Sequence, residues 1–487
     1  MVEPRRFPQI YLPLIGVGIV ALWPLTAYAF NPMLLPALLV VGVATLVVLR
    51  WPEWGLAIAI ALIPLIGVKL PQGPSVGVAL PGQPFRLLVP LMIITVFAYG
   101  ILIYGVDRRR LPGVTLGIAL LLLSAVISAF NAIDPARSTA DVFLLITGGI
   151  LFLAVTNICR TREQLWIVLA GVLAALLIAS IHSIVQHFVG DFSTQGFVAG
   201  GVATGRVQGA FGHPNEYAGF LALLMPLAFA ITFTKSLPRA LRRLAGIAAA
   251  ASIPALVYSY ARGALVTLIL GTILWLVLLR PRYAIALAAV VGIALIAIAP
   301  STLKERLQPS RAQSDLPLRV DVAESALKIY DEHPLFGVGL SNFQLAYAGL
   351  ALDDAGGSQK RLLHDNQLLV PTAPPSQYLN TLAEQGLVGI VSLGIFLLLA
   401  IATAYRACRS IHPAVRGIGL GLGAGIFSLV IYSLLEISLQ EAQLMPLFVL
   451  VGLGAVAEVV YSPGAARIST SRPERRVAAP VRPALSR

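Results

Sequence analysis

Residues 284–299 read AIALAAVVGIALIAIA, a run without a single polar or charged side chain. Apolar runs of roughly 20 residues recur along most of the chain, and an α-helix needs about that length to cross ~30 Å of hydrocarbon. Transmembrane β-strands are short and alternate apolar with polar residues, which is the opposite pattern. The 487 residues are 57% hydrophobic and 12% charged, with a mean hydropathy of +0.85. These values exclude a soluble globular protein and predict an all-α, polytopic membrane bundle.

We predict fourteen hydrophobic spans. They cover residues 10–30, 32–49, 54–70, 86–106, 112–130, 140–158, 164–188, 214–234, 244–259, 263–279, 283–299, 387–405, 417–436 and 442–460. The first eleven spans occupy residues 1–299 and the last three occupy residues 387–461. Between them, residues 300–386 form one long connection with short helices. Residues 462–487 are rich in Pro, Arg and Ala without periodicity, which indicates a disordered basic tail.

The charge distribution predicts the topology. The chain has 35 basic and 22 acidic residues, a net charge of +13. If the connections alternate in side, 23 of the 35 basic residues and six of the 22 acidic residues share a side with both termini. The positive-inside rule then predicts a multi-pass protein of the cytoplasmic (inner) membrane with cytoplasmic termini and an external loop at 300–386. The positive charge is explained by topology and membrane lipids, so it gives no reason to expect a nucleic-acid partner.

The long connection carries its own helix pattern. Leu318, Val322, Ala326 and Ile329 recur at helical spacing, which predicts an amphipathic helix over 317–330 that lies on the membrane or on the bundle. Residues 338–342 then read as a glycine-punctuated turn, and Pro374-Pro375 open a second helix through Tyr378 toward the next span. Long loops of this kind usually carry function.

A second connection, residues 189–216, contains the run Gly209-Ala-Phe-Gly-His-Pro-Asn215. Pro-Asn at the start of a span places helix N-terminal amides at the external surface, where they suit an anion such as phosphate. For Asn215 alone, a helix cap and a ligand contact both remain open.

Several arginines are predicted on the same external side. Arg262 follows the outer end of one span with almost no loop, where an arginine is costly unless it snorkels or has a partner. Arg319 lies on the loop helix, and Arg86 and Arg137 also face outside. Each alone is more often an anchor, but several that converge would suit a diphosphate, because a guanidinium binds phosphate oxygens in a bidentate manner.

These residues together resemble the O-antigen ligase and O-antigen polymerase family (WaaL and Wzy type), over roughly residues 200–400. The motifs that carry the resemblance are Arg206-x-x-Gly209-x-Phe211-x-x-Pro214-Asn215, Arg262-Gly263-Ala264, Arg319, His333-Pro334-Leu335-Phe336-Gly337-Val338-Gly339, and Tyr378-Leu379 followed by Gly386-Leu387-Val388-Gly389.

The resemblance implies an integral-membrane glycosyltransferase of the GT-C type that works at the external face. Such enzymes transfer a glycan from an undecaprenyl diphosphate carrier to a hydroxyl of an acceptor glycan or lipid-linked sugar, and they require no metal or other cofactor. By the same resemblance, Arg206, Arg262 and Arg319 would hold the carrier diphosphate, with Asn215 and Tyr378 as further substrate-binding candidates.

The sequence departs from the family pattern at the position of the usual catalytic base. Family ligases carry His followed by Asn or Ser just before the Tyr-Leu pair, and the corresponding residues here are Pro375 and Ser376. Other bases must therefore be considered. Of the external histidines (His182, His187, His213, His333 and His364), His364 is nearest in sequence to the gap. The acidic candidates are Asp331, Asp365 and Glu384, with Glu436 and Glu441 beyond them.

The missing histidine favours a polysaccharide polymerase or an atypical ligase over a standard lipopolysaccharide ligase. A polysaccharide or anion transporter is one alternative, although we find no internal repeat of the kind that transporters show. A family member that has lost catalysis and serves as an assembly partner is the other.

Overall fold

The computed structural model describes residues 51–67, 85–105, 112–199, 202–279, 316–353, 363–364, 367–368, 373–437 and 441–462. The expected spans at 10–30, 32–49 and 283–299 and nearly all of the expected tail lie outside these residues.

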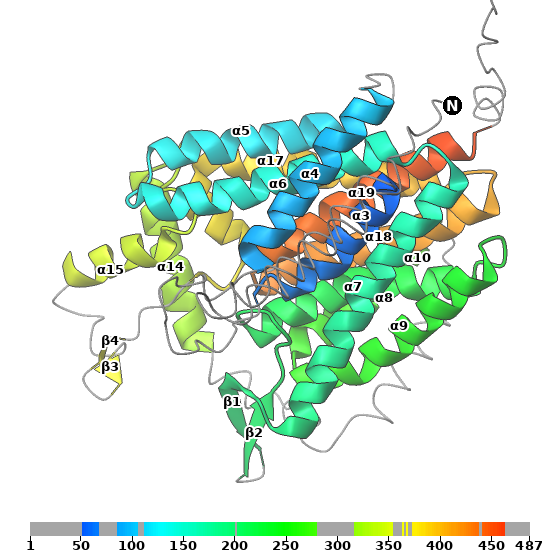
Figure 1. Ribbon diagram of the computed structural model, residues 1–487. Helices are drawn as coiled ribbons and strands as arrows, with labels where there is room; N and C mark the ends of the chain where they lie inside the picture. The colour runs from blue at the N-terminus through cyan, green and yellow to red at the C-terminus, as the bar shows by residue number, and fades with distance from the viewer. Residues whose placement is uncertain are drawn as a thin grey trace, which may run out of the picture.

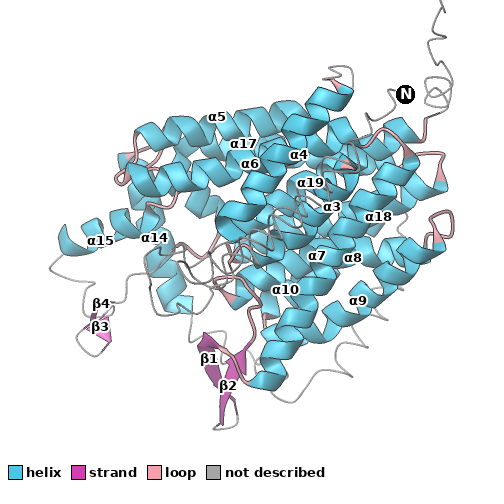
Figure 2. Cartoon of the chain, in the orientation of Figure 1, coloured by secondary structure: helices cyan, strands magenta, loops and turns pink. Residues whose placement is uncertain are grey.

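The described part of the chain is dominated by helices (Figures 1 and 2). Those of the first half are α3 (Pro52–Leu62), the 3₁₀ turn η1 (Ile63–Leu65), α4 (Phe85–Tyr104), α5 (Val114–Phe130), α6 (Pro135–Ile158), α7 (Arg162–Val189), α8 (Pro214–Phe233), α9 (Arg239–Ser259) and α10 (Arg262–Leu279). Those of the second half are α14 (Leu316–Glu332), α15 (Phe343–Asp353), α17 (Gln377–Cys408), α18 (Pro413–Leu435) and α19 (Glu441–Val460). Two antiparallel hairpins complete the set: β1 (Ser193–Ala199) with β2 (Val202–Arg206), and β3 (Leu363–His364) with β4 (Gln367–Leu368).

Each of the eleven expected spans that reach the described residues contains a helix. Six of these helices, α6, α7, α8, α9, α17 and α18, are long and apolar enough to cross a membrane, and five more apolar helices are shorter. The chain is therefore a helical membrane protein, as the sequence indicates, while the total of fourteen spans stays a prediction.

Helix α18 lies at the centre of the packing and contacts α8, α10, α17 and α19. Gly425 explains part of this, since a Cβ at this position would overlap the carbonyl oxygen of Leu223 on α8. Small residues of this kind allow membrane helices to approach closely. Trp275 on α10, Tyr432 on α18 and Phe448 on α19 are among the largest fully buried side chains of the core.

The predicted loop helix is confirmed as α14, which covers the expected residues 317–330. Its buried face is formed by Val322, Ala326 and Ile329, and these pack in one cluster with Phe343 of α15 and Ala383 of α17. Of the two predicted alternatives, the membrane and the bundle, the apolar face of α14 packs on the bundle. In Figure 1, α14 and α15 lie at one end of the bundle, which we call the loop end.

Helix α17 starts within the expected long connection, at Gln377, and is kinked at Gly386, whose φ of 63° and ψ of −159° are not helical. At the kink, Leu387 N donates to the carbonyl oxygen of Pro334 at 2.8 Å, and Val388 N donates to that of Leu335 at 3.2 Å. The family-like motifs at 333–339 and 386–389 are thus bonded to each other. A helix interrupted in this way leaves backbone groups that another segment must satisfy.

Candidate functional site

Arg206 ends strand β2 at the loop end and is only 4% exposed. Its Nε donates to the carbonyl oxygen of Ser259, the last residue of α9, at 2.9 Å. Its Nη2 donates to Oδ1 of Asn215 at 2.5 Å. Burial of a guanidinium is costly unless its N–H groups are hydrogen-bonded, so these two oxygens fix Arg206 between α8 and α9.

Asn215 connects three elements. Its side chain accepts from Arg206, and its carbonyl oxygen accepts from the hydroxyl of Tyr432 at 2.9 Å. Its backbone N–H donates to Nδ1 of His213 at 3.0 Å. The cap of α8 is therefore His213, and the structure corrects the view of Asn215 as the cap. The backbone N–H of Asn215 is already bonded to His213, whereas its side-chain oxygen positions Arg206.

Arg319 of α14 reaches the end of α18. Its Nη1 donates to the carbonyl oxygen of Leu435 at 2.9 Å, and its Nη2 forms an ion pair with Oε1 of Glu436 at 2.6 Å. Glu436 N in turn donates to the carbonyl oxygen of Tyr432 at 2.9 Å. The bonds at Asn215 and at Glu436 thus meet at the same fully buried tyrosine.

Arg262 is the first residue of α10 and is partly buried. Two residues before Arg262, Tyr260 has a left-handed φ of 50° and makes the sharp reversal between α9 and α10. A Cβ on Gly263, the residue after Arg262, would lie 3.1 Å from Cε2 of Tyr432. The start of α10 therefore packs on the ring of Tyr432. We define the arginine cluster as Arg206, Asn215, Arg262, Arg319, Tyr432 and Glu436.

The structure brings the segments of all three predicted arginines to this one place, although more than a hundred residues separate Arg206 from Arg319. Tyr432 connects them, and the sequence offered no signal for it, since it is one aromatic residue within an apolar span. The role of the arginines as diphosphate ligands stays a prediction.

His213 is the histidine whose pKa responds to the cluster. Its pKa is lowered chiefly by burial and further by Arg206 and Arg319, while Glu436 acts in the opposite direction. Because Nδ1 accepts the Asn215 amide, the neutral ring carries its proton on Nε2. His213 is thus a neutral donor in this arrangement. The sequence contained one signal for its position, a residue directly before a proline at the first turn of a span.

The other predicted bases lie on β3, α14 and α17 or outside the described residues. His364 belongs to the two-residue strand β3, where it pairs with Gln367, and Asp365 is not among the described residues. Asp331 is exposed near the end of α14. Their proposed catalytic roles stay predictions.

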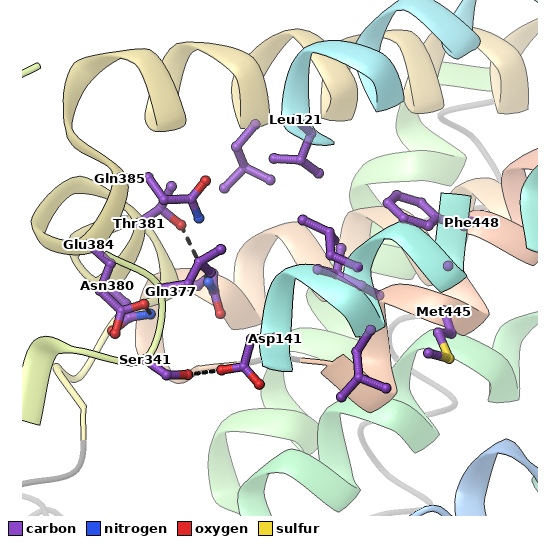
Figure 3. Close-up of a pocket in the computed structure, with 16 residues that line it drawn as sticks. Leu121, Asp141, Ser341, Gln377, Asn380, Thr381, Glu384, Gln385, Met445 and Phe448 are labelled. Atoms are coloured by element: carbon purple, nitrogen blue, oxygen red, sulfur yellow. Dashed lines mark hydrogen bonds between the residues drawn. The ribbon is translucent and has the colours of Figure 1, made fainter. Parts of the chain in front are cut away.

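Glu384 is buried on α17, and its recorded bonds do not involve the arginine cluster. Its Oε1 accepts from Phe343 N at 3.1 Å, and its Oε2 accepts from Nδ2 of Asn380 at 3.0 Å. It lines a cavity of about 70 Å³ between α5, α6, α17 and α19 (Figure 3). The polar lining is Asp141, Ser341, Gln377, Asn380, Thr381, Glu384 and Gln385.

The remaining sequence candidates make structural contacts. Arg86 lies 3.5 Å from Asp141, and Arg137 pairs with Asp134 at the start of α6 at 3.5 Å. The hydroxyl of Tyr378 donates to the carbonyl oxygen of Val430 at 2.9 Å, which ties α17 to α18.

The position of the missing family histidine lies beside the cluster. Ser376, next to Pro375, donates from Oγ to the carbonyl oxygen of Ser433 at 3.1 Å. Ser433 is one residue beyond Tyr432 and three residues before Glu436 on the same chain segment.

Comparison with known proteins gives one finding on the family. The sequence model of the O-antigen ligase family matches residues 247–394, which include α10, α14, α15 and the first part of α17. This match supports membership of that family, as the resemblance predicted, and a ligase- or polymerase-type role in polysaccharide assembly. No curated protein matches the chain.

Proposed function

We propose that this chain, with its O-antigen ligase family segment, is a glycosyltransferase of the inner membrane that transfers a glycan from undecaprenyl diphosphate to a sugar hydroxyl. The arginine cluster at the loop end is its donor site. The observation that carries the proposal is the linkage of Arg206 and Arg319 through Asn215, Tyr432 and Glu436. The proposed GT-C-type architecture, external loop and cytoplasmic termini follow from the family resemblance and the charge pattern.

Several features support a diphosphate at this cluster. The guanidinium groups of Arg206 and Arg319 lie here, and Arg262 starts the helix that packs on the same tyrosine. A guanidinium offers planar pairs of N–H donors, which match phosphate oxygens. Helix α8 begins here, so the positive end of its dipole also favours an anion. The Nε2–H of His213 adds a neutral donor beside the arginines, which have fixed positions before substrate arrives. Preorganised donors of this kind stabilise charge that develops in a transition state.

The proposed reaction is a substitution at the anomeric carbon of the donor sugar. The acceptor oxygen forms a bond to this carbon while the bond from the carbon to the carrier phosphate oxygen breaks. The electron pair stays on the diphosphate, where the arginines balance the added charge. The acceptor hydroxyl loses its proton to a base, so the products are the extended glycan and undecaprenyl diphosphate.

We assign the base to the loop residues His364 and Asp365. Asp331 is a weaker choice because it is exposed on α14, and Glu384 is weaker because both of its oxygens already accept bonds inside the protein. Ser376 lies beside the cluster. The proposed donor site therefore has Pro375 nearby, where family ligases carry the histidine base. The absence of this histidine favours a polymerase or an atypical ligase as the specific activity.

The test compares Arg206→Lys and Arg319→Lys with Arg137→Lys, measured as glycan transfer in membranes with equal amounts of protein. Arg137 is a matched control because it is a half-exposed arginine of the same end of the bundle, paired with Asp134. We expect the two cluster variants to lose at least tenfold, because a lysine keeps the charge and loses the planar pair of donors. The control variant should keep its rate.

Deletion of the gene separates the specific activities. Accumulated single carrier-linked units indicate a polymerase, accumulated long carrier-linked chains indicate a ligase, and blocked export indicates a transporter. A wild-type protein that transfers nothing, or cluster variants that match the Arg137→Lys control, would refute the proposal. If Pro375→His creates transfer in an otherwise inactive protein, the chain is a non-catalytic member of the family.

A further inference from the structure

Glu436 brings a carboxylate into the arginine cluster. It follows the last residue of α18, where its backbone is extended with a φ of −153° and a ψ of 160°. Its Oε1 lies 2.6 Å from Nη2 of Arg319. A nitrogen of the guanidinium that we propose as a phosphate ligand therefore already has an anionic partner inside the protein.

The helix that precedes Glu436 does not explain an acid at this position. The C-terminal end of a helix dipole is negative and favours cations, so a carboxylate there is unfavourable. The carbonyl oxygen of Leu435, the last residue of α18, already accepts from Nη1 of Arg319 at 2.9 Å. Arg319 alone thus satisfies the end of the helix, and the stability of α18 gives no reason for Glu436.

The carboxylate lies in the space that the guanidinium groups of Arg206 and Arg319 share. Burial lowers the pKa of His213 most, and the charges of both arginines and of Glu436 then act on it. All three charged groups therefore lie around one histidine. A phosphate that contacts both arginines must compete with this carboxylate for Nη2 of Arg319.

The ion pair between Arg319 and Glu436 is open enough to be exchanged. The two side chains are 43% and 20% exposed. Ion pairs in contact with water stabilise a protein little, so their separation costs little. A diphosphate brings more negative charge and more oxygens to a guanidinium than one carboxylate does. The bond from Nη1 to the carbonyl oxygen of Leu435 can stay, so Arg319 keeps its place when Glu436 leaves.

We propose that Glu436 is an exchangeable counter-ion of the donor site, which competes with the carrier diphosphate for Arg319. The inference rests on the proposed transferase function. The product, undecaprenyl diphosphate, binds through the same diphosphate as the donor, so the returning carboxylate displaces it from Arg319. Glu436 therefore weakens the binding of donor and product and favours release of the product.

The experiment measures the dissociation constant of undecaprenyl diphosphate for the full-length protein, purified in detergent. Glu436→Gln keeps the size of the side chain and loses its charge. We expect it to tighten binding about 2- to 5-fold, the worth of a partly exposed ion pair. Asp134→Asn is the matched control, because Asp134 pairs with Arg137 at the same end of the bundle and asparagine still caps α6. The control variant should bind as the wild type does.

A second variant and a second readout support the measurement. Glu436→Ala covers loss of folding in Glu436→Gln and should also tighten binding. In membranes, inhibition of transfer by added undecaprenyl diphosphate should strengthen by the same factor. Unchanged or weaker binding in a folded variant, or equal tightening in the control, overturns the counter-ion alone. A wild-type protein that does not bind undecaprenyl diphosphate removes the proposed donor site, and the counter-ion falls with it.

Discussion

Gly386→Ala should strongly destabilise the protein, because two separate features of the kink require glycine. The φ of 63° with ψ of −159° lies in a region that residues with a Cβ adopt only at a cost of about 1–3 kcal/mol. A Cβ would also lie 2.5 Å from the carbonyl oxygen of Leu335 and 2.6 Å from Phe336 N, both backbone atoms. To make room, the loop must leave α17, which breaks the bonds from Leu387 and Val388 at about 0.5–1.5 kcal/mol each.

Together these effects amount to about 2–6 kcal/mol. The assay is thermal unfolding of the purified protein in detergent, with the fraction of monodisperse protein as a second readout. Gly394→Ala is the matched control on the same helix, since nothing lies within 4 Å of a Cβ there. Alanine should stabilise that position slightly, by up to about 1 kcal/mol. If both variants unfold at the same temperature, the bonds between the two family motifs do not require glycine at position 386, and the reasoning is wrong.

Three further predictions concern the arginine cluster. His213→Gln should keep most of the transfer rate, because its amide nitrogen replaces Nε2–H as a donor, whereas His213→Asn keeps only the cap of α8 and should lose about 3- to 10-fold; equal large losses in kcat for both would instead identify a general base. The pKa of His213 is lowered by burial and by its arginine neighbours, so its neutral cap contributes stability above the ordinary value of about 6.5, and this is lost as the pH falls through the lowered pKa. The midpoint of thermal unfolding of the wild type should therefore fall relative to that of His213→Asn in acid, and a constant difference would contradict this. Tyr432→Phe should weaken donor binding about 2- to 10-fold by removing the bond to Asn215, visible as a raised KM for carrier-linked donor, while an unchanged KM would show that the bond is dispensable.

The sequence also predicted part of the candidate site, but it could not rank the members. It named Arg206, Arg262 and Arg319 from their positions at the ends of spans and from family motifs, and the structure brings their segments to one tyrosine. It placed Glu384 among possible bases, whereas the structure puts this residue in a separate cavity. It preferred His364 because this residue is nearest in sequence to the missing family histidine, although His213 is the histidine whose pKa the arginines of the cluster lower.

The difference between these outcomes has a physical cause. Apolar length, helical periodicity and the distribution of charge are local properties, since a segment in hydrocarbon must satisfy its own backbone hydrogen bonds within itself. The sequence by itself therefore determined the membrane class, the apolar helices within the described residues and the amphipathic helix α14. The contact of Asn215 with Tyr432, the bonds between the two family motifs and the ion pair of Arg319 with Glu436 join residues from distant segments. Only the tertiary packing, in which α8 and α17 both lie against α18, decided them.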